Sequence, residues 1–215
     1  MSLQKILDRI EGELSEREEF KDELYIAMRK ATRFSKQAIF SVHKDKLREA
    51  GKLIKDAEKF FSKLDEIPPA CRELVYAGIV NSAFQEYTEA HVLLNLVKNG
   101  KFVDPEKIHV PPTSYLLGLA DVVGELRRRT LDSLRRGDLK NAEKSLENME
   151  FIHDALVGLE KAPRSVPELR RKSDVARRVI EATRGDVTME VRRTSLERSI
   201  KHLEKSIKAK IEKGR

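Results

Sequence analysis

The sequence predicts an all-α protein, and two observations support this fold class. Ala, Leu, Glu, Lys and Arg dominate the 215 residues, of which 37% are charged and 6% aromatic, with few Gly or Pro. Those residues are strong helix formers, and no run rich in β-branched or aromatic residues suggests a strand. Apolar residues also recur every three to four positions, as on one face of a helix. We expect one domain over residues 1–215, a bundle of six or seven helices.

Proline, glycine and capping residues set the boundaries of the predicted helices. The Pro-rich stretch 101–112 is the one substantial loop, and Gly137 marks a second break. Thr113 or Ser114 is expected to cap the helix after the loop, and Asp138 the next one. We therefore expect helices at about 3–14, 18–44, 46–64, 70–99, 113–136, 138–161 and 168–213, the last interrupted at Gly185-Asp186.

Composition and charge exclude several classes of protein. A single cysteine, Cys71, excludes an internal disulfide and a cysteine-based zinc site. The chain begins without the apolar core of a signal peptide and lacks a run of about 18 apolar residues, so we expect a cytoplasmic protein without a membrane partner. Residues 161–215, which include basic C-terminal helices at 168–213, hold 17 Lys and Arg against 8 Asp and Glu. This excess favours nucleic acid as a partner, although a solvated basic helix face has the same composition.

The end of the chain is predicted to be an amphipathic helix. Its apolar residues keep a spacing of three to four, with Lys and Arg on the other side: Leu196, Ile200, Leu203, Ile207 and Ile211. An apolar stripe of this length is typical of a helix that packs against a partner surface.

Two glutamates stand out in the apolar helix expected at 70–99. Glu86 and Glu89 are the only formally charged residues between Glu73 and Lys98. They lie three positions apart, so they share a helix face, and no Lys or Arg follows at helical spacing. Two carboxylates in an apolar setting need a cation, and a divalent metal ion is the simplest one. The alternatives are a solvated notch on an otherwise buried helix, or a pair of glutamates neutralised by an arginine from another helix.

The helix after the loop carries a second polar stripe, followed by arginines. Ser114, Gly118, Asp121 and Glu125 are spaced four, three and four, so they line one face. Arg127, Arg128 and Arg129 come directly after this stripe. They are candidates for phosphate contacts beside an acidic site, or else partners of Glu125 within the helix.

A third stripe lies in the helix expected at 138–161. Its acidic residues are again spaced four, three and four: Glu143, Glu147, Glu150 and Asp154. Glu150 and His153 also form a Glu-x-x-His, the motif of di-iron bundles. That fold needs the motif on two helices, and the other copy, Glu106 with His109, lies in the Pro-rich loop. A di-iron protein is therefore the third and weakest reading.

Three motifs in a fixed order resemble the translin family. They are Arg33-x-x-Lys36-x-x-Ile39-Phe40-x-x-His43, Phe84-Gln85-Glu86-Tyr87-x-Glu89-Ala90, and the continuous run from Tyr115-Leu116-Leu117-Gly118 to Gly124-Glu125-Leu126-Arg127. The Glu-Tyr-x-Glu pair resembles the translin-associated protein X branch, because translin itself lacks it. The similarity spans most of the chain and is weakest before residue 20 and after residue 160.

This resemblance implies a fold, an activity and a set of functional residues. The implied subunit has seven helices and assembles into a hollow homo-oligomer, an octamer, with RNA or single-stranded DNA inside. The implied activity is that of a Mg²⁺-dependent endoribonuclease, with Mn²⁺ as an alternative ion. Catalytic, metal-binding carboxylates carry over to Glu86, Glu89 and Asp154, with Glu150, Asp121 and Glu125 as secondary candidates. The implied contacts to nucleic acid are Arg33, Lys36, Arg127, Arg128 and Arg129.

Ser114 departs from the family pattern. Nuclease-type members have Asp at this position, and a hydroxyl is a poorer Mg²⁺ ligand than a carboxylate. A weakened nuclease, a substitution made to trap substrate, and compensation by Asp121 are all consistent with it. The rival function is a translin-like protein that binds nucleic acid without cleaving it and uses the carboxylates structurally.

Overall fold

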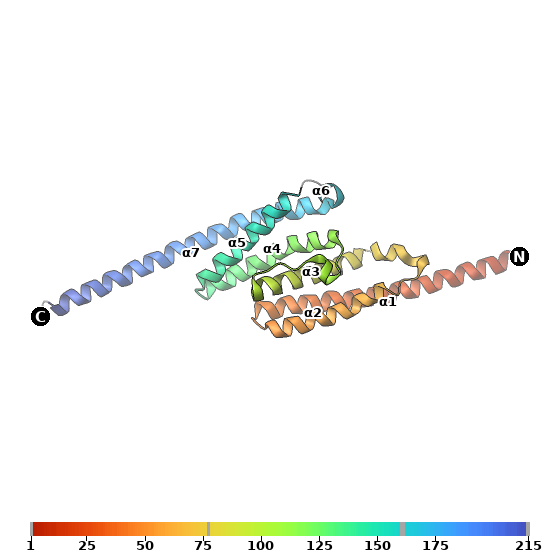
Figure 1. The fold of residues 1–215 in the computed structure, drawn as a ribbon, viewed down its shortest axis with the longest axis horizontal. Helices are drawn as coiled ribbons and strands as arrows, with labels where there is room; N and C mark the ends of the chain where they lie inside the picture. Colours follow the sequence, from red (N-terminus) through yellow and green to blue (C-terminus); the bar gives the residue numbers. More distant parts are fainter. Residues whose placement is uncertain (1, 77, 160–161, 214–215) are drawn as a thin grey trace.

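Helices make up nearly all of the computed structural model, which describes residues 2–76, 78–159 and 162–213. Figure 1 shows their order: α1 (Leu3–His43), α2 (Leu47–Phe61), α3 (Gly78–Asn99), α4 (Pro112–Arg135), α5 (Leu139–Val157), α6 (Ala162–Ser165) and α7 (Pro167–Lys213). Three short 3₁₀ helices join them: η1 (Ser62–Leu64), η2 (Pro69–Tyr76) and η3 (Pro105–Ile108). The described ranges contain no strand, so the predicted all-α class is confirmed.

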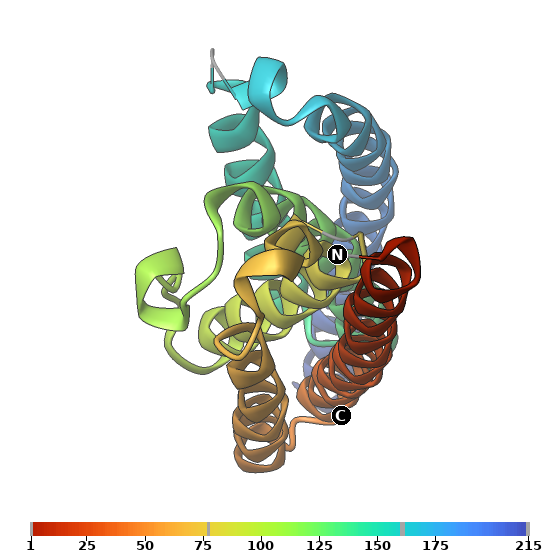
Figure 2. The same cartoon turned by 90° about the vertical axis from the view of Figure 1, so that its right-hand side faces the viewer.

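The helices pack as a layered bundle with α3 and α4 at its centre. On one side α1 packs against α2 and α3, and on the other α4 packs against α5 and α7. In the end-on view of Figure 2, α3 and α4 lie between the α1–α2 pair and the α5–α7 pair. Residues on α3 and α4 therefore face each other across the middle of the molecule.

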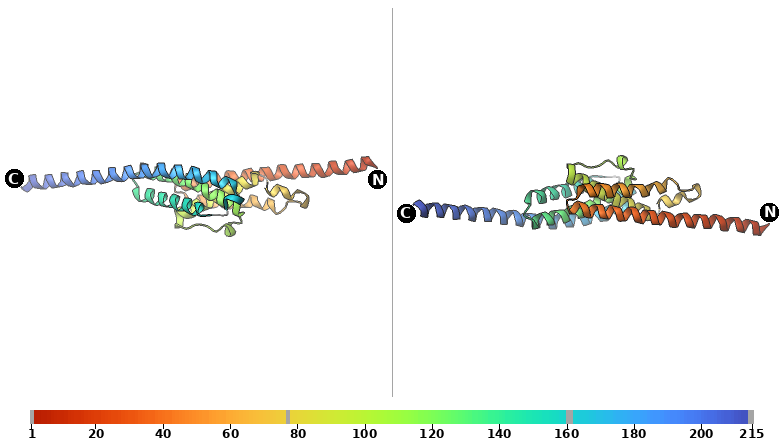
Figure 3. Two further views of the ribbon diagram at one scale, coloured as in Figure 1. Left: turned by 90° about the horizontal axis from the view of Figure 1, so that it is seen from above. Right: turned by 90° about the horizontal axis from the view of Figure 1, so that it is seen from below.

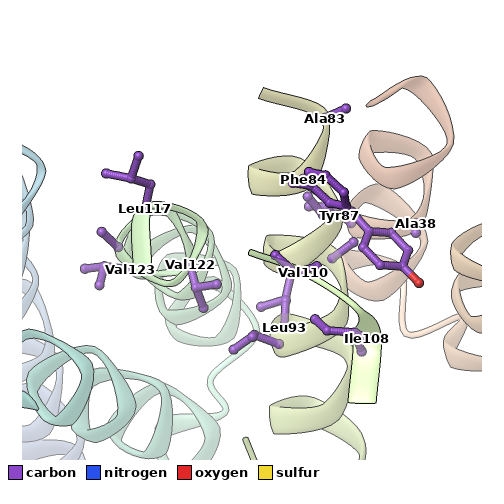
Figure 4. Close-up of a cluster of buried hydrophobic side chains, with 14 of the residues drawn as sticks. Ala38, Ala83, Phe84, Tyr87, Leu93, Ile108, Val110, Leu117, Val122 and Val123 are labelled. Atoms are coloured by element: carbon purple, nitrogen blue, oxygen red, sulfur yellow. The ribbon is translucent and has the colours of Figure 1, made fainter. Parts of the chain in front are cut away.

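The apolar sequence of α3 explains its central position. Tyr87 and Leu93 are almost completely buried, as are Val122 and Val123 on α4. Figure 4 shows Tyr87 and Phe84 beside Ala38 of α1, and the loop residue Val110 close to Leu93. The Tyr87 ring packs against Phe61 of α2 at a centroid distance of 5.0 Å. Burial of so many large side chains around one helix is the main source of stability here.

A glycine brings the two central helices into close contact. A Cβ added to Gly118 on α4 would lie 2.6 Å from the backbone oxygen of Gln85 and 2.8 Å from Cβ of Thr88, both on α3. No other residue type fits there without moving α3. Gly118 therefore fixes how α4 meets the part of α3 that carries the two glutamates.

Several predicted helix boundaries differ from those observed. α1 runs unbroken from Leu3, because residues 15–17 contain neither Gly nor Pro. α7 continues through Gly185, since one glycine costs only about 1 kcal/mol and Thr183 and Val187 on either side are buried. α4 begins at Pro112, a favourable first position, so neither Thr113 nor Ser114 is its cap.

The cap at Asp138 is confirmed, because its carboxylate accepts a hydrogen bond from the Asn141 N–H at 3.2 Å. The predicted end of that helix at Lys161 lies outside the described residues.

The two longest helices extend beyond the bundle in opposite directions. Figures 1 and 3 show the start of α1 and the end of α7 projecting from opposite ends. We call residues 3–19 the N-terminal arm and residues 189–213 the C-terminal arm. Each presents exposed apolar residues spaced four, three and four, namely Leu3, Leu7, Ile10 and Leu14 on one arm and Leu196, Ile200, Leu203 and Ile207 on the other. The side chain of Ile211, also predicted to belong to this stripe, lies outside the described set.

None of the helices in the described ranges combines the length and apolarity needed to cross a membrane.

Candidate functional site

Four carboxylates gather where α3 and α4 face each other. Glu86 and Glu89 lie on α3, and Asp121 and Glu125 lie on α4, one and two turns beyond Gly118. The pKa of Glu89 is raised by three negative charges besides burial, in the order Asp121, Glu86 and Glu125. The two predicted stripes therefore form one acidic site.

Glu89 is the buried member of the group. It is 8% exposed, and the described residues show no ion pair to its carboxylate. Burial is the largest effect and, with the neighbouring carboxylates, raises the pKa of Glu89 to about 9 from an ordinary value of 4.5. Lys172 acts in the opposite direction. At neutral pH the carboxyl group therefore keeps its proton.

Each carboxylate around Glu89 has a basic partner from another helix. Lys36 of α1 lies 3.1 Å from Glu86, with its side chain 62% exposed. Lys172 of α7 contacts the Asp121 carboxylate and lies 3.3 Å from the amide oxygen of Gln85. The last residue of α1, His43, lies 2.5 Å from Glu125.

The pKa of Glu125 is lowered, mainly by its hydrogen bond with His43. Burial raises this pKa, whereas the charges of His43 and Arg128 lower it further. This carboxylate is therefore held in its ionised form, in contrast to Glu89.

Glu86 thus has a cationic partner from another helix, but this partner is Lys36 and not an arginine, and it pairs with Glu86 alone. Among the described residues, no group of three or more His, Cys, Asp or Glu side chains is close enough together to hold a metal ion. The four carboxylates share an electrostatic environment, but three of them, Glu86, Asp121 and Glu125, are turned to basic partners. Metal coordination by three of them requires rotamer changes that release those partners.

The structure does not bring Asp154 into this site. Its side chain is 83% exposed on α5 and contacts the neighbouring His153 at 3.4 Å. The guanidinium of Arg184 pairs with Glu150 at 2.6 Å. Glu150 is the main cause of a raised pKa at Arg184, and the charge of Asp154 adds to it. Glu150 is therefore engaged in an α5–α7 ion pair. Of the predicted metal residues, Glu86, Glu89, Asp121 and Glu125 come together, and the two from α5 do not join them.

The three consecutive arginines of α4 have different surroundings. Arg127 donates to the carbonyl of Val179 at 3.3 Å and to the Thr183 hydroxyl at 3.4 Å, which ties α4 to α7. Arg129 pairs with Asp45 at 3.1 Å and is only 13% exposed. Arg128 is 50% exposed and lies 3.9 Å from Glu125. Arg128 is thus the one of the three whose side chain faces solvent beside the acidic site.

Ser114 occupies a buried position at the start of the α4 stripe. It is 1% exposed, and within the described part of the chain its hydroxyl has no hydrogen-bond partner. An Asp at this position would add another carboxylate to a buried face.

A basic cavity borders the acidic site. It measures 630 Å³, and its lining includes Phe40, His43, Lys44, Arg128 and Arg136. Phe40 is 49% exposed, and Lys44 lies over its ring at 4.2 Å. His43 and Arg128 belong both to this cavity and to the surroundings of Glu125.

Sequence reasoning missed the role of Lys172, which lies 51 residues from its partner Asp121. His43 was part of a predicted motif, but nothing in the sequence showed that it meets Glu125, 82 residues away. The basic composition of α7 was a general signal for a cation near the site, but it could not single out one lysine.

Comparisons with known proteins agree with these motifs and this fold. The chain resembles an uncharacterized protein of Methanocaldococcus jannaschii, MJ0175, with 27% identity over 199 residues, covering 89% of this chain and 85% of the other. Its fold resembles that of AfC3PO in a complex with duplex RNA, with 33% identity, a TM-score of 0.74 and coverage of 86% and 95%. Apo-NeC3PO has the same fold at 23% identity and a TM-score of 0.77, with coverage of 88% and 100%.

The translin family model matches residues 19–183, which include all three motifs and the four clustered carboxylates. This chain therefore belongs to the translin family.

Proposed function

We propose that this protein is a metal-dependent endoribonuclease that binds RNA and acts as a homo-oligomer. The observation that carries this proposal is the buried Glu89, whose pKa is raised by burial and by three neighbouring carboxylates. Such an arrangement is unfavourable without an additional cation, and perturbed carboxylates of this kind are typical of functional sites.

The donor set fits Mg²⁺ or Mn²⁺, which prefer carboxylate oxygens. We assign the ion to Glu86, Glu89 and Asp121, with Glu125 as a further ligand. Asp121 replaces Asp154 in this assignment because, next to burial, the charge of Asp121 raises the pKa of Glu89, whereas Asp154 is exposed on α5. When bound, such an ion lowers the pKa of a coordinated water and offsets charge on the phosphate.

The chain's own residues prepare the site for RNA cleavage. Glu89 holds a proton at neutral pH and must release it before its carboxylate can act as a ligand. Lys36 is exposed beside Glu86 and can leave it to contact a phosphate. Arg33 and Arg128 also have exposed side chains. These three residues position RNA by contacts to its phosphate backbone, and such contacts do not read its sequence.

Similarity to AfC3PO supports RNA as the ligand. A structure of that protein holds duplex RNA, and 33% identity over 86% of this chain is enough to extend the proposal to RNA binding here. The Glu-Tyr-x-Glu pair supports placement in the translin-associated protein X branch. Single-stranded DNA and a cytoplasmic location remain predictions.

The two arms support assembly into a homo-oligomer. The N-terminal arm holds 3 Lys and Arg against 6 Asp and Glu, and the C-terminal arm holds 8 against 4. Both carry an exposed apolar stripe with the spacing of a coiled-coil seam. Opposite charge and matching stripes favour pairing of one copy's N-terminal arm with the C-terminal arm of another. Repetition of this contact closes a ring when the rotation permits, and we retain an octamer as its size.

The second candidate function is nucleic-acid binding without cleavage. Two observations favour it: Glu86, Asp121 and Glu125 already have basic partners, and Ser114 stands where nuclease-type members have Asp. In that case the carboxylates would stabilise the α1–α3–α4–α7 packing and bind no metal.

A cleavage assay with matched substitutions separates the two functions. Single-turnover cleavage of a labelled RNA is measured at increasing Mg²⁺ and Mn²⁺ for the parent, Asp121→Asn and Asp154→Asn. We expect cleavage by the parent, a loss of at least about 100-fold for Asp121→Asn, and no significant loss for Asp154→Asn. RNA binding in all three proteins with no metal-dependent cleavage would establish the non-catalytic function.

A further inference from the structure

Lys172 is a shielded cation at the acidic site. It lies near the start of α7, and its side chain is only 18% exposed. Its ammonium group contacts a carboxylate oxygen of Asp121 on α4 and lies 3.3 Å from the Gln85 amide oxygen on α3. One ammonium therefore links three helices, and Gln85 directly precedes Glu86.

The environment of Lys172 differs from that of the other basic residues at the site. Lys36 contacts Glu86 with a side chain that is 62% exposed, so water screens its charge. His43 is engaged with Glu125 at the far end of the α4 stripe. Lys172 is thus a strongly shielded ammonium in contact with Asp121, one of the three carboxylates that surround Glu89.

We propose that Lys172 is a built-in counter-cation, which holds Asp121 in the metal-free protein and which a divalent metal ion must displace. This inference rests on the metal site in the proposed function. The ammonium and a metal ion would have to share the single carboxylate of Asp121. Two cations on its adjacent oxygens repel each other strongly in a shielded site. The lysine therefore lowers metal affinity and keeps the metal-free site folded.

The role of a competing cation explains two features of the structure together. The carboxylates share an electrostatic environment, yet no three of the described side chains are close enough together to hold a metal ion. Lys172 draws Asp121 to itself, and Lys36 does the same for Glu86. Four neighbouring carboxylates, of which Glu89 is buried, would otherwise carry a large electrostatic cost whenever metal is scarce.

The test is Mn²⁺ binding by the full chain, measured by isothermal titration calorimetry for the parent, Lys172→Met and Lys172→Arg. We expect Lys172→Met to bind Mn²⁺ about tenfold more tightly, because the competing charge is gone. Lys172→Arg keeps the charge and should stay within about threefold of the parent. Without metal, Lys172→Met should have a lower thermal midpoint, and saturating Mn²⁺ should remove most of that difference.

Arg184→Met provides a matched control on the same helix. It removes an ion pair between α7 and Glu150 of α5 and should leave Mn²⁺ affinity unchanged. Unchanged affinity in Lys172→Met would show that Lys172 only joins α7 to α4, and weaker affinity would show that it positions Asp121 for the metal. Either result overturns the inference. A parent protein that binds no Mn²⁺ refutes the metal site itself and so the proposed function.

Discussion

Replacement of Glu89 by Gln should make the protein more stable, and increasingly so as the pH rises. Gln has the shape of a protonated Glu but cannot ionise, so it suits a buried position among carboxylates. The unfolded chain releases the Glu89 proton near pH 4.5, whereas the folded chain keeps it until about pH 9. Between these values the unfolded state binds fewer protons, so the stability of the parent falls as the pH rises.

The size of this effect follows from the two pKa values. Each pH unit between them corresponds to about 1.4 kcal/mol. Relative to the parent, Glu89→Gln should therefore gain almost nothing at pH 4.5, about 3 kcal/mol at pH 7 and about 6 kcal/mol at pH 9. These are large fractions of the stability of a domain, which is about 5 to 15 kcal/mol.

The assay is urea unfolding followed by circular dichroism at pH 5, 7 and 9, in EDTA and at one protein concentration. Glu147→Gln, which changes an exposed carboxylate on α5, is the control and should follow the parent at every pH. With Mg²⁺ the parent should regain stability, most at high pH where Glu89 loses its proton readily, and Glu89→Gln should regain little. Parallel stability curves for the parent and Glu89→Gln would refute the electrostatic account of the site.

Three further predictions concern packing, RNA binding and assembly. Gly118→Ala should lower the free energy of unfolding by about 2 kcal/mol, because its Cβ meets the α3 backbone; an unchanged urea midpoint would contradict the close contact. Arg128→Ala should weaken RNA binding and flatten its dependence on salt, whereas Arg129→Ala should mainly reduce stability; equal salt slopes for Arg128→Ala and the parent would exclude the phosphate contact. If the arms pair head to tail, Leu7→Gln and Leu203→Gln should each reduce the assembled mass in light scattering, and mixing them should restore pairing between their intact arms. Assembly of Leu7→Gln alone would instead indicate that C-terminal arms pair with each other.

Most of the fold could be predicted because it depends on local signals. Composition and apolar spacing indicated an all-α bundle, and Pro112, Gly137 and Asp138 lie at real helix boundaries. The error at Gly185 shows what local signals leave out. A weak local signal, such as Gly185, was read as a break, while buried neighbours on α7 hold the helix together across it. Tertiary packing decides such positions, and it does not appear in the local sequence.

The site was predictable to the extent that its residues lie on one helix face. Two carboxylates in an otherwise uncharged helix identified Glu86 and Glu89, and spacing identified the stripe with Asp121 and Glu125. Spacing could not show which helix faces the glutamates, and the predicted third ligand on α5 came from the family resemblance alone. The Asp154→Asn experiment tests whether cleavage depends on Asp154, which is exposed on α5.

One residue in the sequence, Gly118, indicated that α4 packs closely against another helix. Gly118 lies in the middle of the α4 stripe, and glycine within a helix is costly unless a neighbour needs the space. The structure shows that neighbour to be the α3 backbone at Gln85, next to Glu86. A polar stripe interrupted by glycine therefore marks the helix face that approaches another backbone. That contact places Asp121 near Glu89, but the choice between metal binding and charge compensation depends on Lys172, a residue 51 positions further along the chain.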